Sequence, residues 1–177
     1  MARPFSTRVT WDRFPHRVEV WDPAGKRVKV LADNPLKDEV PEEDYIVPLG
    51  KARTHREGTD LTIVTYAAMV HKSAEAAEVL QKEDGLSVEI IDLRTLLPLD
   101  EDAVIQSVKK TNRLLIVHED TRTGGIAGEI AMRVNEKAWE WLDAPPLRVA
   151  AVDAPVPYSP PLEDYFLPQV EDVVKAA

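Results

Sequence analysis

The chain has 177 residues, of which 44% are hydrophobic and 30% charged, which suits one domain of ordinary globular composition with an appendage. A net charge of −9 argues against nucleic acid as a partner, because binding phosphate needs a basic face. There is no cysteine for disulfides or thiolate chemistry, and we find neither an apolar run long enough for a membrane span nor the apolar core of a signal peptide, so we expect a cytoplasmic protein.

Residues 1 to 35 are predicted to be an N-terminal extension with a β-hairpin. The stretch RVEVWDPAGKRVKVLAD alternates apolar and polar residues on both sides of Asp22-Pro23-Ala24-Gly25, which has the composition of a turn. Because a lone hairpin is marginal in water, we expect it to lie on another part of the molecule. Residues 36 to 60 are rich in proline and charge, and we expect an extended linker there that includes an edge strand at most.

Residues 61 to 177 alternate between strand and helix patterns. Short apolar runs predict strands at 61–66, 87–93, 113–119 and 147–153. Helical spacing predicts helices at 67–83, 99–110, 126–142 and 169–177, with Asp100 as an N-cap. The third helix is predicted to bury a stripe of Ile126, Ile130, Val134, Ala138 and Trp141. This alternation predicts the α/β class, with a mostly parallel sheet between two layers of helices.

One strand end has the composition of a functional corner. His118, Glu119 and Asp120 end the strand VHED, and Gly124 and Gly125 then precede a helix. Parallel sheets bind ligands at such strand ends, and a helix N-terminus favours anions. However, TGG matches neither GxGxxG nor a P-loop, and a histidine at a strand end is more often a packing residue. The packing interpretation is therefore favoured over a catalytic one.

The remaining candidates are weaker. The other histidines, His16, His55 and His71, show no metal-ligand spacing, and no serine or threonine lies in a nucleophile-elbow sequence. From the residues alone, we predict no catalytic, cofactor-binding or metal-binding residue in the chain. Trp139 and Trp141 are two positions apart and cannot share a helix face, so one should be buried and the other exposed, as at an interface.

Three stretches carry a resemblance to a known family. EVPEEDYIVPLGKARTHREGTDLTIVTYAA, EIIDLRTLLPLDEDAVIQSVKKTNRLLIVHEDTRTGGIAGEIA and LDAPPLRVAAVDAPVPYSPPLEDYFLP resemble the C-terminal part of the β subunit of the thiamine-diphosphate-dependent 2-oxoacid dehydrogenase E1 component. The HEDTRTGG motif is closer to branched-chain 2-oxoacid (2-oxoisovalerate) dehydrogenase than to pyruvate dehydrogenase. Residues 61–177 are accordingly expected to adopt the transketolase C-terminal fold, a five-stranded sheet with one antiparallel edge strand.

The resemblance also implies partners and a cofactor. In this family an α2β2 E1 decarboxylates a 2-oxoacid on thiamine diphosphate with Mg2+ and passes the acyl group to lipoyl-E2. The cofactor lies between the α subunit and an N-terminal β domain that this sequence does not match, so we expect no cofactor on this chain alone and no activity of its own. Expected partners are the E1 α subunit, a second β subunit and the basic subunit-binding domain of E2.

Site residues follow from the same resemblance. Asp143 occupies the position of an acidic residue that docks E2, although the second acidic contact of that pattern is replaced by Leu147 or Arg148. His118, Glu119, Gly124 and Gly125 are expected at a subunit interface. Two alternatives stay open at this point: a free-standing binding or regulatory module that reuses the fold, and one half of a split transketolase-like enzyme.

Overall fold

The computed structural model describes residues 16–21, 26–34 and 47–177, and the chain divides into two compact units, 1–46 and 47–177. In the first unit, β1 (His16–Trp21) pairs antiparallel with β2 (Arg27–Asn34), with register shifts at two points. The hairpin is therefore present, as the alternating pattern predicted. Its proposed turn, Asp22 to Gly25, lies outside the described residues.

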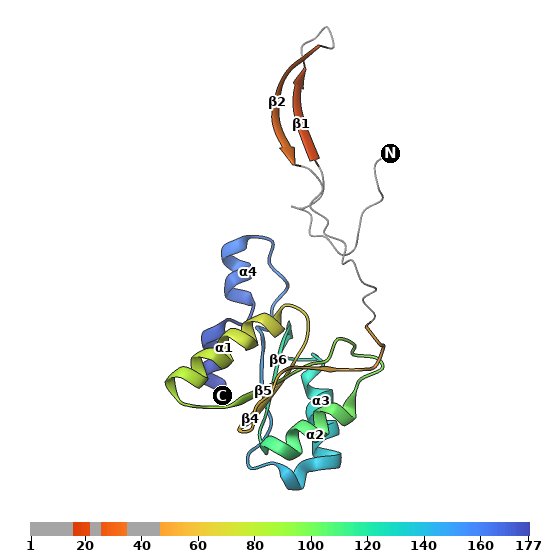
Figure 1. The fold of residues 1–177 in the computed structure, drawn as a ribbon, viewed down its shortest axis with the longest axis vertical. Helices are drawn as coiled ribbons and strands as arrows, with labels where there is room; N and C mark the ends of the chain where they lie inside the picture. Colours follow the sequence, from red (N-terminus) through yellow and green to blue (C-terminus); the bar gives the residue numbers. More distant parts are fainter. Residues whose placement is uncertain (1–15, 22–25, 35–46) are drawn as a thin grey trace. The chain divides into compact units, whose positions relative to one another are not determined.

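The second unit is an α/β domain built on a five-stranded sheet with the order β3-β5-β4-β6-β7. Its strands are β3 (Arg53–Arg56), β4 (Leu61–Thr65), β5 (Val88–Asp92), β6 (Leu114–Thr121) and β7 (Leu147–Ala151). Its helices are α1 (Met69–Glu83), α2 (Glu101–Thr111), α3 (Ala127–Ala138), α4 (Pro160–Phe166) and α5 (Val170–Ala176), with a 3-10 turn η2 (Trp139–Trp141) after α3. Figure 1 shows the sheet between its helices.

The central strands are apolar because both faces of the sheet are covered. Every residue of β4 is buried. One face packs with α1 and α5 around Ile63 and Ile90, and the other packs with α2 and α3 around Val64 and Ile116 (Figure 1). The predicted α/β/α layering is thus confirmed.

The sheet is mixed because β3 pairs antiparallel with β5, while β4, β5, β6 and β7 run parallel. The expected antiparallel edge strand is therefore β3, inside the segment assigned to the linker. Because β4 is central, with β5 on one side and β6 on the other, the chain reverses its winding direction there. The carboxyl ends of β4 and β6 consequently flank a topological switch point.

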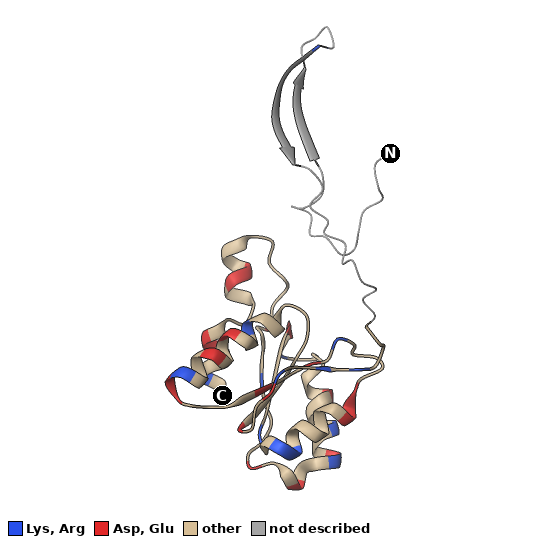
Figure 2. Ribbon diagram, viewed as in Figure 1, with Lys and Arg blue, Asp and Glu red and all other residues tan. Residues whose placement is uncertain are grey.

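The predicted N-cap of α2 is confirmed. The Asp100 carboxylate accepts a hydrogen bond from Ala103 N at 3.4 Å. It also accepts one from Ala52 N at 3.0 Å, which ties the segment before β3 to the start of α2. Acidic residues occupy the first turn of α2 and lysines its last (Figure 2), which complements the helix dipole.

The predicted helix 126–142 is too long, and its buried stripe is wrong at Trp141. α3 ends at Ala138, and the backbone tightens into η2, so the phase of the helix is lost. Trp139 is 67% exposed and Trp141 42% exposed, which also corrects the expectation that one of them is buried. In addition, the proline-rich segment holds a helix that we did not predict, α4, which begins at Pro160.

Candidate functional site

His118 ends the apolar part of β6 and is fully buried. Its ring stacks on Tyr66, which follows the neighbouring strand β4, with a centroid distance of 6.4 Å and an interplanar angle of 6°. The pair therefore lies at the switch point of the sheet. Neither ring nitrogen has a hydrogen-bond partner of normal geometry among the described residues, although the Asp120 backbone lies near enough to favour protonation.

Burial lowers the pKa of His118 because it penalises the charged imidazolium, and the Asp120 carboxylate opposes this only in part. Burial also raises the pKa of the Tyr66 hydroxyl, with Asp120 and Glu119 adding to the rise. Both rings are consequently held neutral near pH 7. His118 is buried and Tyr66 is half-buried, so the two rings pack the inside of this corner.

The two glycines have different roles. Gly124 has φ +81°, a left-handed conformation that glycine adopts at little cost. A Cβ on Gly125 would lie 2.5 Å from the Thr121 carbonyl oxygen and 2.6 Å from His118 Cε1. Glycine is thus required at position 125 by close packing against the histidine ring. His118 and Thr121 fill the space on the Cβ side of Gly125, so this side of the turn has no room for a diphosphate.

Hydrogen bonds fix the remainder of the turn. Thr123 donates from its backbone N and from its hydroxyl to the two carboxylate oxygens of Asp153, both at 2.7 Å. These bonds lower the pKa of Asp153. Thr121 Oγ1 donates to the Thr123 carbonyl at 3.0 Å. Asp153 was not identified from the sequence, because its partner lies 30 positions earlier in the chain.

The corner therefore brings together His118, Tyr66 and Gly125 but assembles no nucleophile with a general base. Glu119 is half-buried, and Asp120 is exposed at the rim. Among residues 16–21, 26–34 and 47–177, no group of three His, Asp or Glu could hold a metal ion. The arrangement suits a rigid surface turn with an acidic rim, and the assignment of His118, Glu119, Gly124 and Gly125 to a subunit interface stays a prediction.

The state of His118 predicts a pH dependence of stability. The pKa of the folded histidine is below its ordinary value of about 6.5, so unfolded chains bind more protons as the pH falls below 6.5. We expect the free energy of unfolding to decrease there by up to about 1.4 kcal/mol per pH unit from this one group. Urea denaturation at pH 7.5 and 5.5 measures the decrease.

The control for this measurement is His118→Asn, which cannot titrate in this range. Wild type should lose more stability than the variant between the two pH values, and the difference isolates the histidine from the carboxylates. Equal losses in both proteins would show that His118 does not titrate with a lowered pKa.

Asp143 lies on the other side of the domain, in the loop between η2 and β7. It is exposed, and it lines a hollow of about 480 Å³ with Trp139, Leu142, Pro145 and Pro146. The loop is anchored to the end of α2, because Asp143 N donates to the Asn112 carbonyl at 2.8 Å and Asn112 Nδ2 donates to the Trp141 carbonyl at 2.7 Å. The backbone of the loop is therefore anchored, and the exposed Asp143 carboxylate lies beside a hollow with both apolar and polar lining residues. Of the two tryptophans noted in the sequence, Trp139 lines the hollow and Trp141 does not.

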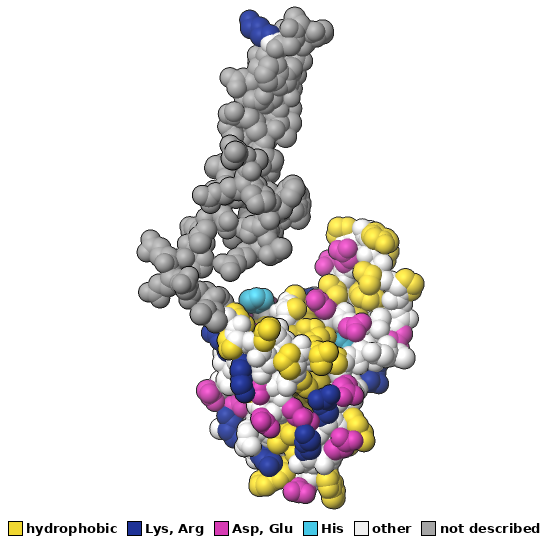
Figure 3. All heavy atoms as spheres, turned by 90° about the vertical axis from the view of Figure 1, so that its right-hand side faces the viewer, with side chains coloured by type: hydrophobic (Ala, Val, Ile, Leu, Met, Phe, Trp, Pro, Cys, Tyr) yellow, Lys and Arg dark blue, Asp and Glu magenta, His cyan; other side chains and the backbone are white. Residues whose placement is uncertain are grey.

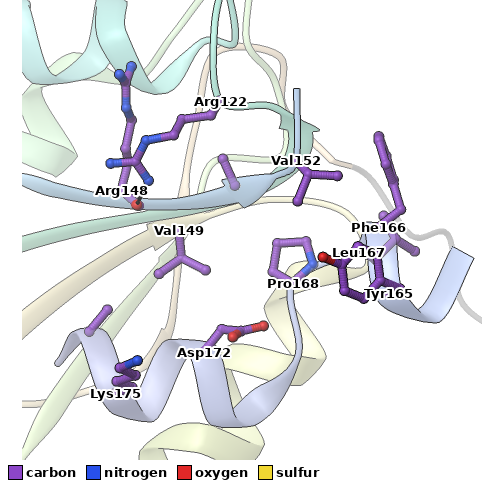
Figure 4. Close-up of a pocket in the computed structure, with 12 residues that line it drawn as sticks. Arg122, Arg148, Val149, Val152, Tyr165, Phe166, Leu167, Pro168, Asp172 and Lys175 are labelled. Atoms are coloured by element: carbon purple, nitrogen blue, oxygen red, sulfur yellow. Dashed lines mark hydrogen bonds between the residues drawn. The ribbon is translucent and has the colours of Figure 1, made fainter. Parts of the chain in front are cut away.

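A second hollow, of about 500 Å³, lies along the edge strand β7. Figure 4 shows Arg122 and Arg148 together at one end and Tyr165 at the other, with Val149 and Pro168 between them. Arg122 Nη1 donates to the Arg148 carbonyl at 3.2 Å, so this arginine supports the start of β7.

Charges of both signs are mixed on one face of the domain. On the face drawn in Figure 3, Lys and Arg side chains lie between Asp and Glu side chains and do not form a continuous basic field. In the part of the chain that the structure describes, no helix has the length and apolar character needed to cross a membrane.

Comparison with known proteins gives consistent relatives. Residues 50–173 match the family described as transketolase, C-terminal domain. The chain is 50% identical over 142 residues to the pyruvate dehydrogenase E1 component subunit beta of Bacillus subtilis (strain 168). It is 46% identical over 143 residues to the 2-oxoisovalerate dehydrogenase subunit beta of the same organism. Each alignment covers 80% of this chain and 43% of the relative, so the chain spans less than half the length of these curated relatives.

A solved structure described as "Split gene transketolase, inactive beta4 tetramer" aligns with a TM-score of 0.64 and 26% identity. The alignment covers 78% of this chain and 44% of that one. The transketolase C-terminal fold expected from the sequence is confirmed. The choice of branched-chain over pyruvate dehydrogenase stays a prediction, because relatives of both kinds are similar to this chain to nearly the same degree.

Proposed function

The chain belongs to the transketolase C-terminal domain family, and on that premise we propose that it forms the C-terminal domain of the β subunit of a 2-oxoacid dehydrogenase E1 component. In this role it performs no chemistry of its own. It holds E1 subunits together and presents a docking surface to the subunit-binding domain of E2. The similarity to β subunits from two such enzymes supports this proposal, as does the close packing of His118 in the strand-end corner.

The observation that carries the docking proposal is the surroundings of Asp143. Protein interfaces combine a buried apolar centre with a polar rim, and tryptophan is enriched among the residues that contribute most to binding. The hollow beside Asp143 offers the exposed Trp139 ring and two prolines next to one carboxylate. A basic partner domain would be steered by the carboxylate and anchored by the apolar wall.

Asp143→Lys tests this proposal. We expect the variant to bind a purified E2 subunit-binding domain at least tenfold more weakly than the wild-type chain, since the substitution reverses a charge facing a basic partner. Isothermal titration calorimetry at about 150 mM salt measures the affinity. At higher salt the affinities of the two proteins for the E2 domain should differ less, because salt screens the interactions between exposed charges.

The matched control is Glu75→Lys, which makes the same charge change on exposed α1. α1 covers the opposite face of the sheet from α3, so the control alters the net charge and leaves the hollow intact. We expect affinity within twofold of wild type. If both substitutions weakened binding equally, the effect would come from net charge alone. If Asp143→Lys bound as wild type does, E2 would dock on another surface.

For the strand-end corner we propose contact with an E1 subunit, either the α subunit or a second β subunit. Two features support this contact: the turn is held rigidly, and acidic side chains lie at its surface. Thr123 and Asp153 lock the turn, and Glu119 and Asp120 carry acidic groups at the surface. A preformed turn loses little conformational entropy when it binds, so it is well suited to a subunit contact.

We propose that thiamine diphosphate and Mg2+ bind to the complete E1 enzyme and not to this chain alone. The filled space on the Cβ side of Gly125 supports that division. The HEDTRTGG motif supports a branched-chain 2-oxoacid as substrate, with pyruvate as the alternative. Decarboxylation assays of the reconstituted enzyme on both acids would distinguish them.

A second candidate function is favoured by the similarity to the split-gene transketolase structure. Here the chain would complete an active site together with a separately encoded chain. Co-purification with a cofactor-domain chain, followed by a 2-oxoacid decarboxylation assay, decides between the two. Activity that appears only in the mixture supports the split enzyme, and a mixture without activity contradicts it.

A further inference from the structure

A third hollow has a volume of about 380 Å³, and its lining residues lie far apart in the sequence. It lies at the antiparallel edge of the sheet, where β3 and the carboxyl end of β5 meet the start of α1. Arg53 and Asp92 are register partners on β3 and β5. Its lining residues are Val47, Arg53, His55, Ala67, Val70, His71, Asp92 and Arg94.

The lining is rich in groups that donate hydrogen bonds to anions. It contains two guanidinium groups, from Arg53 and Arg94, and two imidazoles, from His55 and His71, against the single carboxylate of Asp92. These residues come from β3, from the end of β5 and the loop after it, and from the start of α1, so the clustering is a result of the fold. We propose that this hollow binds a small phosphate-bearing ligand. The proposal is independent of the subunit role argued above.

The Asp92 carboxylate does not cancel this character. Its Oδ1 accepts from Arg94 N at 3.1 Å, and its Oδ2 lies 3.9 Å from Arg94 Nε. Both side chains are 20% exposed. Asp92 therefore helps to position Arg94. Among the described lining residues, two guanidinium groups stand against this one carboxylate.

The chemistry favours phosphate over a monocarboxylate. Guanidinium groups bind the oxygens of phosphate in pairs, and several donors around one hollow match a tetrahedral ligand with many acceptors. The first turn of α1 borders the hollow, has no acidic residue and has no side-chain cap, so it adds a favourable dipole. The volume falls within the roughly 300–1,000 Å³ usual for small-ligand sites.

The test is a 1H–15N correlation titration of the full chain with sodium phosphate at pH 7, with sodium chloride adjusted to hold ionic strength constant. We expect saturable shifts confined to the amides of residues 53–55, 67–71 and 92–95. Shifts that grow linearly without saturation, or that centre on Arg122 and Arg148, would overturn the proposal. A parallel titration with succinate separates the ligand classes, since tighter binding of the dicarboxylate would overturn the assignment to phosphate.

Arg53→Gln removes one guanidinium from an exposed edge position and keeps the polar side chain. We expect it to weaken phosphate binding at least fivefold. The matched control is Arg113→Gln, which removes the same charge from an exposed position just before β6, at the opposite end of the sheet. The control should bind as wild type does. Equal affinity of all three proteins would overturn the proposal.

Discussion

Gly58→Ala is expected to destabilise the domain by about 3 kcal/mol, which is at the upper end of the usual overpacking range. A Cβ at this position would lie 2.2 Å from both Glu89 N and the Val88 carbonyl carbon. Both contacts are to backbone atoms of β5, so no side-chain rotation can relieve them. The segment before β4 would have to move away from the sheet. Urea denaturation measures the loss as a lower midpoint.

The substitution would also disturb a buried charge. Glu89 is 3% exposed, and Gly58 N donates to its carboxylate at 3.4 Å. Burial raises the pKa of Glu89, but hydrogen bonds from Lys110, Ser107 and Gly58 outweigh this and lower it. The Lys110 ammonium pairs with the same carboxylate. The backbone N–H of residue 58 would move away from this carboxylate, which adds to the steric cost because a buried carboxylate needs its partners.

Gly128→Ala is the matched control for this prediction. Gly128 lies in the first turn of α3, and its new Cβ would meet no atom nearer than Arg148 Nη1 at 3.7 Å. Alanine is favoured over glycine in a helix by about 1 kcal/mol, so stability should be unchanged or higher. If Gly58→Ala unfolded at the wild-type midpoint, the close approach to β5 would be refuted.

Gly125→Ala is the second substitution with a large expected effect, a loss of about 2 kcal/mol. The new methyl group would clash with two atoms, the Thr121 carbonyl oxygen and His118 Cε1, both closer than 3 Å. The clash with Thr121 involves the backbone of the turn, whereas the clash with the His118 ring can be removed by a second substitution. The free energy of unfolding from urea denaturation gives the size of the loss.

A double-mutant cycle with His118→Ala separates the two clashes. Removal of the ring should relieve only the contact with Cε1, so the loss caused by Gly125→Ala should be about 1 kcal/mol smaller in the His118→Ala background. The Thr121 contact remains and should keep part of the cost. Additive effects of the two substitutions would show that the ring and the glycine are not in contact.

Regular elements were predictable where local pattern and burial agree. The strands β4, β5, β6 and β7 and the helices α1 and α2 follow apolar runs and helical spacing, and Asp100 caps α2 as its position implied. Each of these signals lies within about 15 residues of chain, and each matches the burial that the fold imposes. The resemblance added the antiparallel edge strand, which pattern alone left inside a linker.

Two predictions from the sequence were wrong, those for the end of α3 and for α4, and both depend on more than local pattern. The end of α3 depends on η2 and on the anchoring of the following loop to Asn112, which lies 29 positions from Trp141. Continuous helical spacing cannot reveal where such an anchor interrupts the helix. We did not predict α4 because a proline-rich stretch is typical of extended chain, although proline is tolerated in the first turn of a helix.

The same distinction holds for the functional sites. The sequence by itself determined the elements, the family resemblance and the residues at the strand-end corner, because spacing and residue type act locally. Only the tertiary structure decided that the His118 ring fills the space before Gly125, and that Arg53, His55, His71 and Arg94 line one hollow. These groups meet because strands far apart in the chain are paired in the sheet, and pairing over such distances is set by burial of the whole core.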